Sequence, residues 1–328
     1  MKKYKICKIL LVILAIFLCV AFYELLGICV AYKKQPEVSN TTKKETKNGS
    51  WNECSENTER AVIIEKNPEA LLQRVRLIKN AKKEIILSTF AFQSDESGKL
   101  ILGALHDAAD RGVHIRLLVD GMESWIDMEG NPYFYGLSSH ENVEIKLYNK
   151  ANPLKPWKMM GRMHDKYLIA DGKRYILGGR NTHNYFLGDF PGHKNYDRDV
   201  LVVCDEPEKE NSVNQLLEYF ETIWEQEDSD YFHDNKKLAN RKSVKNAVLE
   251  LQNGYQKYFE ENKERICDTD YTDETFETEK IALVSNPIHT GSKEPVVWYQ
   301  LGELMKNAKN RVKIHTPYII CNDNHSDR

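Results

Sequence analysis

A long uncharged stretch at the N-terminus sets the first limit on what this chain can fold into. No charged residue occurs between Ile9 and Tyr23, and a second apolar run follows Glu24. Together the two runs exceed the roughly 20 residues that a helix needs to cross a bilayer. A cleaved signal peptide is the alternative, but the stretch is long for one and its candidate cleavage site is poor. We therefore expect residues 1–32 to form a retained transmembrane anchor.

Lysines on both sides of this stretch bear on its orientation. Four precede it, and four more lie between residues 33 and 44. Because positively charged flanks favour the cytoplasmic side, the two groups compete. We expect the N-terminus to lie inside. The helix would anchor the protein in the cell membrane, and this orientation would leave the globular part on the extracytoplasmic side.

The remainder of the 328-residue chain has the composition of a globular protein. Its residues are 41% hydrophobic and 29% charged, with a formal net charge of −3. This balance argues against a nucleic-acid partner, since nucleic-acid-binding domains usually carry a clear basic excess. Residues 33–58 are almost devoid of apolar side chains and are expected to form a flexible polar linker. Folded sequence begins near Arg60.

Apolar runs of strand type alternate with amphipathic segments from this point onward. Helical spacing over residues 68–83 and 98–112 alternates with strand-like runs over 84–92 and 113–121. Such a βαβ pattern predicts an α/β fold with a mixed, largely parallel sheet flanked by helices. Further strands are expected at 142–150, 166–170, 174–179 and 199–205, and a helix at 212–226. The Asp171-Gly172 pair predicts a hairpin between the strands 166–170 and 174–179.

An internal repeat indicates that the chain holds one complete half and the start of a second. Residues 76–92 align without gaps to residues 303–319, at an offset of 227 residues. A chance match of a short helix-strand unit is the alternative. We expect a first domain at 59–233, a helical connection at 234–277 and an incomplete second domain at 278–328. The counterpart of His164 would fall beyond Arg328.

The stretch MHDKYLIADGKRYILGGRN, residues 163–181, carries the strongest chemical signal. His164 and Lys166 are two residues apart, so they would point to the same face of a strand. An imidazole can act as a nucleophile or acid/base near neutral pH, and an ammonium suits an anionic substrate. The Asn181 amide could join Lys166 in binding phosphate oxygens. Asp171 lies at the turn and is better suited to bracing it.

The spacing His164-x-Lys166-x4-Asp171, followed by Gly178-Gly179-Arg180-Asn181, resembles the HKD signature of the phospholipase D superfamily. The stretch AADRGVHIRLLVDG, residues 108–121, is similar to the bacterial cardiolipin synthase branch of that family. The resemblance covers about residue 61 to the C-terminus. It implies an α+β sandwich of phospholipase D type, and a chemistry that needs no metal or cofactor.

The resemblance also implies roles for individual residues. One HKD histidine attacks phosphorus to form a phosphohistidine, and a second protonates the leaving alcohol. His164 would be the nucleophile, and Lys166 and Asn181 would bind phosphate together with the backbone at Gly179, where the family commonly has serine. Asp197 fits the acidic residue that orients the histidine, and Asp199 fits less well.

A second HKD motif is not found in the sequence. His183, His193, His289, His315 and His325 all lack a lysine two residues later. Either the sequence is a truncated copy whose missing half supplies the second histidine, or two chains pair their single motifs as a homodimer. The internal repeat favours truncation.

Three functions follow from these features. The first is a membrane-anchored phosphatidyltransferase that moves a phosphatidyl group between anionic phospholipids such as phosphatidylglycerol. The second is a phospholipase D-type hydrolase or a nuclease acting as a homodimer, although the anchor and the near-neutral charge make nucleic acid unfavourable. The third is an inactive membrane protein, because half of an active site is insufficient.

Three other features have competing interpretations. His164 could be a hydrogen-bonded core histidine, but its neighbours at these spacings argue against that. A set of His183, His193, Asp197 and Cys204 matches no standard metal-ligand spacing. The segment NPLKPWKMMGR, residues 152–162, mixes lysines with tryptophan and methionine. It would suit either an anionic membrane surface or a solvated loop.

Overall fold

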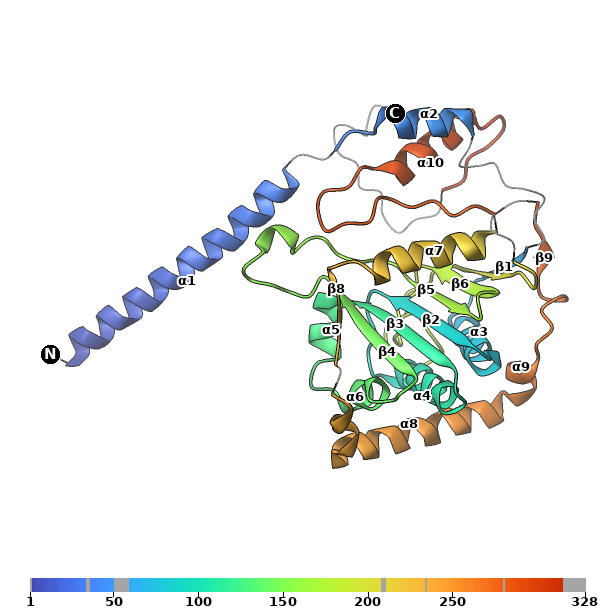
Figure 1. The fold of residues 1–328 in the computed structure, drawn as a ribbon, viewed down its shortest axis with the longest axis horizontal. Helices are drawn as coiled ribbons and strands as arrows, with labels where there is room; N and C mark the ends of the chain where they lie inside the picture. Colours follow the sequence, from blue (N-terminus) through green and yellow to red (C-terminus); the bar gives the residue numbers. More distant parts are fainter. Residues whose placement is uncertain are drawn as a thin grey trace.

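The computed structural model describes residues 2–33, 36–49, 59–207, 211–233, 235–279 and 281–314. Figure 1 shows α1 projecting from a globular part in which helices cover a central sheet. The helices and strands are, in chain order, α1 (Lys2–Tyr32), α2 (Asn40–Asn48), β1 (Arg60–Ile64), α3 (Asn67–Asn80), β2 (Glu84–Thr89), α4 (Glu96–Asp110), β3 (His114–Asp120), α5 (Gly121–Asp127), α6 (Pro132–Ser138), β4 (Val143–Tyr148), η2 (Pro156–Lys158), β5 (Tyr167–Ala170), β6 (Arg174–Gly178), β7 (Asp199–Val203), α7 (Ser212–Trp224), β8 (Ser229–Tyr231), η3 (Lys236–Asn240), α8 (Lys242–Glu261), α9 (Lys263–Cys267), β9 (Phe276–Glu277) and α10 (Val296–Asn307).

The sheet is open and mixed, with the strand order β8-β4-β3-β2-β5-β6-β7-β1-β9. Pairing is parallel between β2 and β3 and between β3 and β4. The other described pairs are antiparallel. The predicted mixed α/β fold is confirmed, but the expectation of a largely parallel sheet is wrong. Strands β2, β3 and β4 are joined by helical connections long enough for parallel pairing. The tight turn after β5 instead makes β6 run antiparallel to it.

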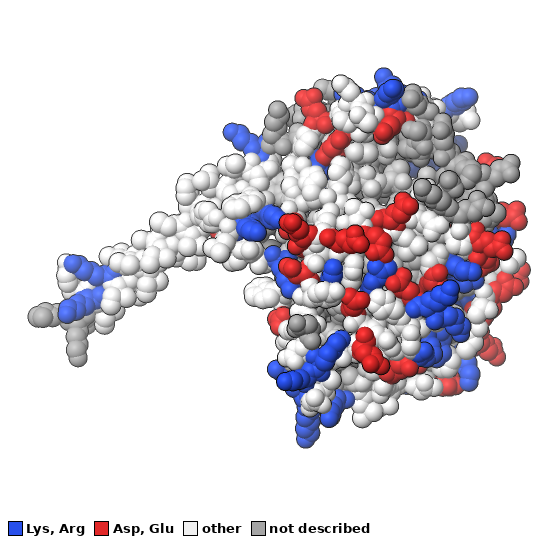
Figure 2. Space-filling model, viewed as in Figure 1, with Lys and Arg blue, Asp and Glu red and all other residues white. Residues whose placement is uncertain are grey.

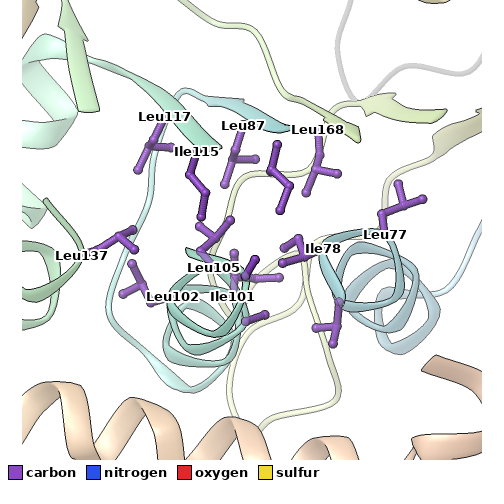
Figure 3. Packing of buried hydrophobic residues seen from close by; sticks show 14 of the residues in the cluster. Leu77, Ile78, Leu87, Ile101, Leu102, Leu105, Ile115, Leu117, Leu137 and Leu168 are labelled. Carbon is purple, nitrogen blue, oxygen red and sulfur yellow. The ribbon is translucent and has the colours of Figure 1, made fainter. Parts of the chain in front are cut away.

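Alternate residues of the central strands enter two separate apolar layers. Ile85 and Leu87 of β2 pack with α3 and α4, whereas Ile86 faces Phe220 of α7 on the other side. Figure 3 shows Leu87 and Leu168 of the sheet above the α4 leucines. Burial on both faces explains why β2 reads as an almost continuous apolar run. Each such buried side chain stabilises the fold by about 1.5–3 kcal/mol.

The residues predicted to be a flexible linker contain a helix. Within 33–58, α2 begins after Ser39, whose side chain accepts a hydrogen bond from the Thr42 N–H. It ends at Gly49, whose positive φ of 73° suits a glycine cap. The backbone N–H of Ser39 also donates to Glu294, 2.8 Å away. Polar composition alone did not reveal this helix, because capping and a distant partner stabilise it.

The two segments of the predicted repeat each contain the end of a helix at the equivalent residue. Helix α3 ends at Asn80 and α10 ends at Asn307, the same offset of 227 residues. Both are followed by an alanine in extended conformation. The repeat predicts a strand after α10 that would match β2. Residues 311–314 are described and are not in a strand, and the remainder of that prediction, including His315, lies outside the described residues.

Charge is distributed evenly over the face shown in Figure 2, where Lys and Arg alternate with Asp and Glu. Most of the exposed length of α1 is uncharged in that view, and lysines lie near its N-terminal end. Residues Tyr4–Tyr32 of α1 are long and apolar enough to cross a membrane. The structure therefore keeps the predicted separation between an apolar helix and a globular part of mixed charge.

Candidate active site

The hairpin formed by β5 and β6 carries the motif, as predicted. Ala170 pairs with Arg174, and Asp171 and Gly172 both adopt positive φ in the connecting turn. The Asp171 carboxylate accepts hydrogen bonds from the backbone N–H groups of residues 82, 83 and 84, at 2.7–3.1 Å. It thereby ties the turn to the start of β2. Asp171 lies at the opposite end of β5 from His164, which suits the bracing role expected from its place in the turn.

His164 and Lys166 come together immediately before β5, in an extended segment that precedes the ladder. Nζ of Lys166 lies 3.2 Å from Nδ1 of His164 and donates to the His164 carbonyl oxygen at 2.8 Å. The Phe90 ring packs against the imidazole, with 4.6 Å between ring centroids. His164 is exposed, while Lys166 is only 6% exposed. The two side chains meet as expected, although the strand assumed to carry them begins only at Tyr167.

Asp120, which the sequence analysis missed, holds the segment that leads to His164. It ends β3, is completely buried, and accepts hydrogen bonds from Arg162 and from the Met163 N–H. The same carboxylate caps α5 by accepting from the Met122 N–H at 3.0 Å. A strand-end aspartate followed by glycine was the available signal, but its partner lies 42 residues away in the sequence.

The other predicted phosphate-binding residues, Asn181 and Gly179, do not touch His164 or Lys166 among the described contacts, and they do not line the cavity that His164 and Lys166 line. The side-chain oxygen of Asn181 accepts a hydrogen bond from the Ala91 N–H, next to Phe90. Gly179 lies so close to Asp197 that a Cβ at residue 179 would overlap the Asp197 carboxylate. A side chain at residue 179 would therefore require the exposed Asp197 carboxylate to move.

Asp197 makes no hydrogen bond to His164 among the described contacts. Its Oδ1 accepts from the Arg198 N–H at 2.7 Å, and its charge acts on Lys166. Among the described contacts, Nδ1 of His164 is approached by Lys166 instead. The alternative, Asp199, is fully buried between Arg74 at 2.9 Å and Arg180 at 3.2 Å, where it neutralises core arginines.

A cavity of about 380 Å³ opens at the motif. His164, Lys166 and Arg162 line one side, and residues 283–286 and 293 line the other. Asp165 also reaches it and accepts a hydrogen bond from Tyr219 of α7 at 2.7 Å. Sequence analysis did not assign Lys293 to the site, because it lies far along the chain in a segment without regular structure.

Burial and neighbouring charge shift the pKa values of these groups. Partial burial lowers the pKa of His164, and the adjacent Lys166 lowers it further, while Asp120 opposes both. Burial lowers the pKa of Lys166 to about 8, against the attraction of Asp165 and Asp197. Burial also raises the pKa of Asp165 and lowers the pKa of Lys293. Near neutral pH the site thus combines a neutral imidazole with an ammonium of reduced basicity.

Residues that could hold a metal ion are not brought together in the described part of the chain. His183 packs against the rings of Tyr185 and Phe186, and His193 contacts Asn195. The arrangement around His164 can instead hold an anion between cationic and amide groups and present an imidazole to it. Such an arrangement suits the binding of a phosphate group.

A protein-family model described as "Cardiolipin synthase, PLD-like domain" matches residues 74–224, which contain the whole His164 hairpin. The chain is a member of the phospholipase D superfamily. The match begins in α3 and ends in α7, so this phospholipase D-like domain coincides with the helix-covered sheet that positions the motif.

Known proteins resemble this phospholipase D-like chain over part of their length. An uncharacterized protein of Helicobacter pylori strain J99 is 30% identical over 212 residues, covering 60% of this chain and 39% of that protein. Cardiolipin synthase C of Escherichia coli is 29% identical over 171 residues, covering 48% of this chain and 34% of its own length. A crystal structure of phosphatidylserine synthase from Haemophilus influenzae aligns at 17% identity and a TM-score of 0.45, covering 67% of this chain and 48% of that one. The chain thus spans about a third to two fifths of these two curated relatives.

Proposed function

We propose that this protein is a membrane-anchored phosphatidyltransferase that moves a phosphatidyl group from one phospholipid to the hydroxyl group of another. The observation that carries the proposal is the contact between His164 and Lys166 at the mouth of a cavity within a phospholipase D-like domain. The description of the family and the name of the E. coli relative support a phospholipid as the substrate. The apolar helix α1 would hold the domain at the membrane that contains it.

In the first step a ring nitrogen of His164 attacks phosphorus. The N–P bond forms as the P–O bond to the leaving alcohol breaks, and that oxygen takes up a proton. Lys166 lies at Nδ1, so Nε2 is the nitrogen better placed for attack. For Nε2 to attack, the ring hydrogen must sit on Nδ1. Lys166 would therefore turn from Nδ1 to a phosphate oxygen when substrate binds.

Lys166 and the Asn181 amide would hold the non-bridging oxygens during this step. The site is partly buried, so the Lys166 ammonium would stabilise the negative charge on these oxygens more strongly than it would in water. In the second step an acceptor hydroxyl attacks phosphorus, the N–P bond breaks, and the hydroxyl proton passes to a base. Water in place of the acceptor alcohol would give hydrolysis.

The acid that protonates the leaving alcohol would come from a second histidine. We propose that a second copy of this chain, or a second half of the fold, supplies it. Specific activity measured at increasing protein-to-lipid ratios separates the two sources. A pairing of two chains would make specific activity rise with surface density, whereas a site completed within one chain would keep it constant.

The proposal is tested by incubating the full chain in vesicles containing phosphatidylglycerol, and separately with single-stranded DNA. We expect the vesicles to yield a phospholipid in which one glycerol bridges two phosphatidyl groups, together with free glycerol. His164→Ala should lower that rate at least about a thousandfold, because it removes the nucleophile. His140→Ala is the matched control, since His140 pairs with Asp110 on the helical side of the sheet. Equal activity in His164→Ala would overturn the mechanism, and nucleotide release from DNA would favour a nuclease.

A further inference from the structure

The exposure of α1 divides the helix into two parts. Residues 4–20 are exposed on all sides, a length of about 26 Å at 1.5 Å per residue. From Ala21 onward one face is covered, at Ala21, Glu24, Gly27, Ile28, Ala31 and Tyr32, which recur at helical spacing. The uncharged run begins at Ile9, so the roughly 20 residues that cross a bilayer's hydrocarbon core end near Ile28, within the covered part. The covered part therefore lies where the helix leaves the hydrocarbon.

Residues 152–162, which include η2 and are called the η2 segment below, cover that face. The Tyr23 hydroxyl donates to the Leu154 carbonyl oxygen at 3.0 Å. Gly27 lies against Pro156, and a Cβ there would come within 2.5 Å of the proline ring. Figure 1 shows this segment extending from the globular part toward α1. Because Gly27 lies near the point where the helix leaves the hydrocarbon, Pro156 and the residues around it are held beside the lipid headgroups.

Large apolar side chains are exposed on this same side of the molecule. Leu154 is 78% exposed, and Trp157 and Met160 are exposed beside it. On α5, Trp125 is 68% exposed and Ile126 is exposed next to it. Helix α5 and the η2 segment adjoin, because Met122 and Met159 line one cavity of about 260 Å³ between them. Tryptophan is characteristic of the membrane interface, and clustered exposed apolar side chains mark a contact surface.

Charge does not drive contact here. Lys150, Lys155 and Lys158 line the cavity, but so do Glu227, Asp228 and Asp230. Lys158 is paired with Asp228 at 2.6 Å, and Lys150 donates to the Tyr231 carbonyl oxygen. With positive and negative groups nearly balanced, the apolar side chains are left to provide the attraction.

We propose that Trp125, Ile126, Leu154, Trp157 and Met160 form an interfacial surface that inserts into the headgroup region of the membrane spanned by α1. Arg162 follows this surface in the chain and lines both its cavity and the His164 cavity. Insertion therefore turns the mouth of the His164 cavity toward the lipid headgroups. The inference rests on the membrane anchoring within the proposed function, but not on the reaction.

The test uses the full chain reconstituted in phosphatidylcholine vesicles, with and without bromine-labelled acyl chains that quench tryptophan emission. In the double variant Trp125→Phe with Trp157→Phe, quenching should fall at least about twofold, because the variant lacks the tryptophans placed at the interface. Trp298→Phe on α10 is the matched control and should keep the quenching. Quenching that is unchanged in the double variant would overturn the proposal.

Leu154→Glu provides a second test that does not depend on tryptophan. It should reduce quenching and slow turnover of vesicle lipid several-fold, while hydrolysis of a soluble phosphodiester such as bis(p-nitrophenyl) phosphate is unchanged. Leu249→Glu, an exposed leucine on α8, should do neither. Quenching that disappears in high salt would also overturn the proposal, because apolar insertion is not screened. If the wild type turns over no lipid, the proposed reaction is wrong, but the quenching experiment still shows whether the interfacial surface inserts into the membrane.

Discussion

Nζ of Lys166 lies 3.2 Å from Nδ1 of His164, with Lys166 almost fully buried behind the exposed imidazole. Lys166 therefore lowers the pKa of His164 in addition to the effect of burial, while burial lowers the pKa of Lys166 itself. A nucleophilic imidazole must be neutral, whereas a phosphate-binding lysine must be charged. Their pKa values thus bracket the pH range in which the proposed reaction can run.

The first prediction concerns pH. The value of kcat/KM on a soluble phosphodiester should rise as His164 loses its proton, below its ordinary pKa of about 6.5. It should fall as pH passes about 8, where Lys166 loses its proton. Lys166→Arg should remove the alkaline fall, even at a lower rate, because arginine stays charged. An alkaline fall retained in Lys166→Arg would assign it to another group.

The second prediction concerns Asp120. Asp120→Asn weakens the hydrogen bonds to Arg162 and the Met163 N–H, and should lower the free energy of unfolding by about 2 kcal/mol. It should also lower activity, because the segment before His164 loses its anchor. Urea unfolding measures the first effect. Asp205→Asn is the control, since the exposed Asp205–Arg174 pair should contribute little. Equal stability of the two variants would contradict the assignment.

The third prediction separates bracing from catalysis. Asp171→Ala leaves three backbone N–H groups without their acceptor and should destabilise the fold by about 2 kcal/mol. Activity per folded molecule should stay within a few-fold of the wild type at low temperature, as measured by turnover after correcting for the folded fraction. A loss as large as that in His164→Ala would place Asp171 in the chemistry.

The fourth prediction couples Gly179 to Asp197. A serine at residue 179 would displace the Asp197 carboxylate, which helps to keep Lys166 charged. Gly179→Ser should therefore move the alkaline limb of the pH profile downward, by up to about one unit. Asp197→Ala should shift it similarly.

A double-mutant cycle checks this coupling. Gly179→Ser should have little further effect in the Asp197→Ala background, because the clash is already gone. Two effects that add fully would show that the residues act independently.

Several features were accessible from local sequence. The apolar run gives α1, the alternation of apolar segments gives the parallel β2–β3–β4 unit, and Asp171-Gly172 gives the β5–β6 hairpin. Each depends on side-chain period or turn chemistry within a few residues. The pairing of His164 with Lys166 follows for the same reason, since two residues of extended chain return a side chain to the same face.

Other features were decided by contacts between residues distant in sequence. The sheet was expected to be largely parallel, whereas most of its described strand pairs are antiparallel. The sequence did not reveal this, because the period of a strand is the same whether its neighbour runs parallel or antiparallel. The helix α2 was missed because caps and Glu294 stabilise a segment with no apolar face.

By itself, the sequence determined that this protein has an apolar helix, a helix-covered sheet and a motif that pairs an imidazole with an ammonium. Only the tertiary structure decided that Asp120 holds the motif, that Lys293 faces it, and that Asp197 lies against Gly179. The physical reason is range. Spacing along the chain determines which face of a strand or helix a side chain occupies. Its partners and its pKa depend on the distant segments that pack beside it.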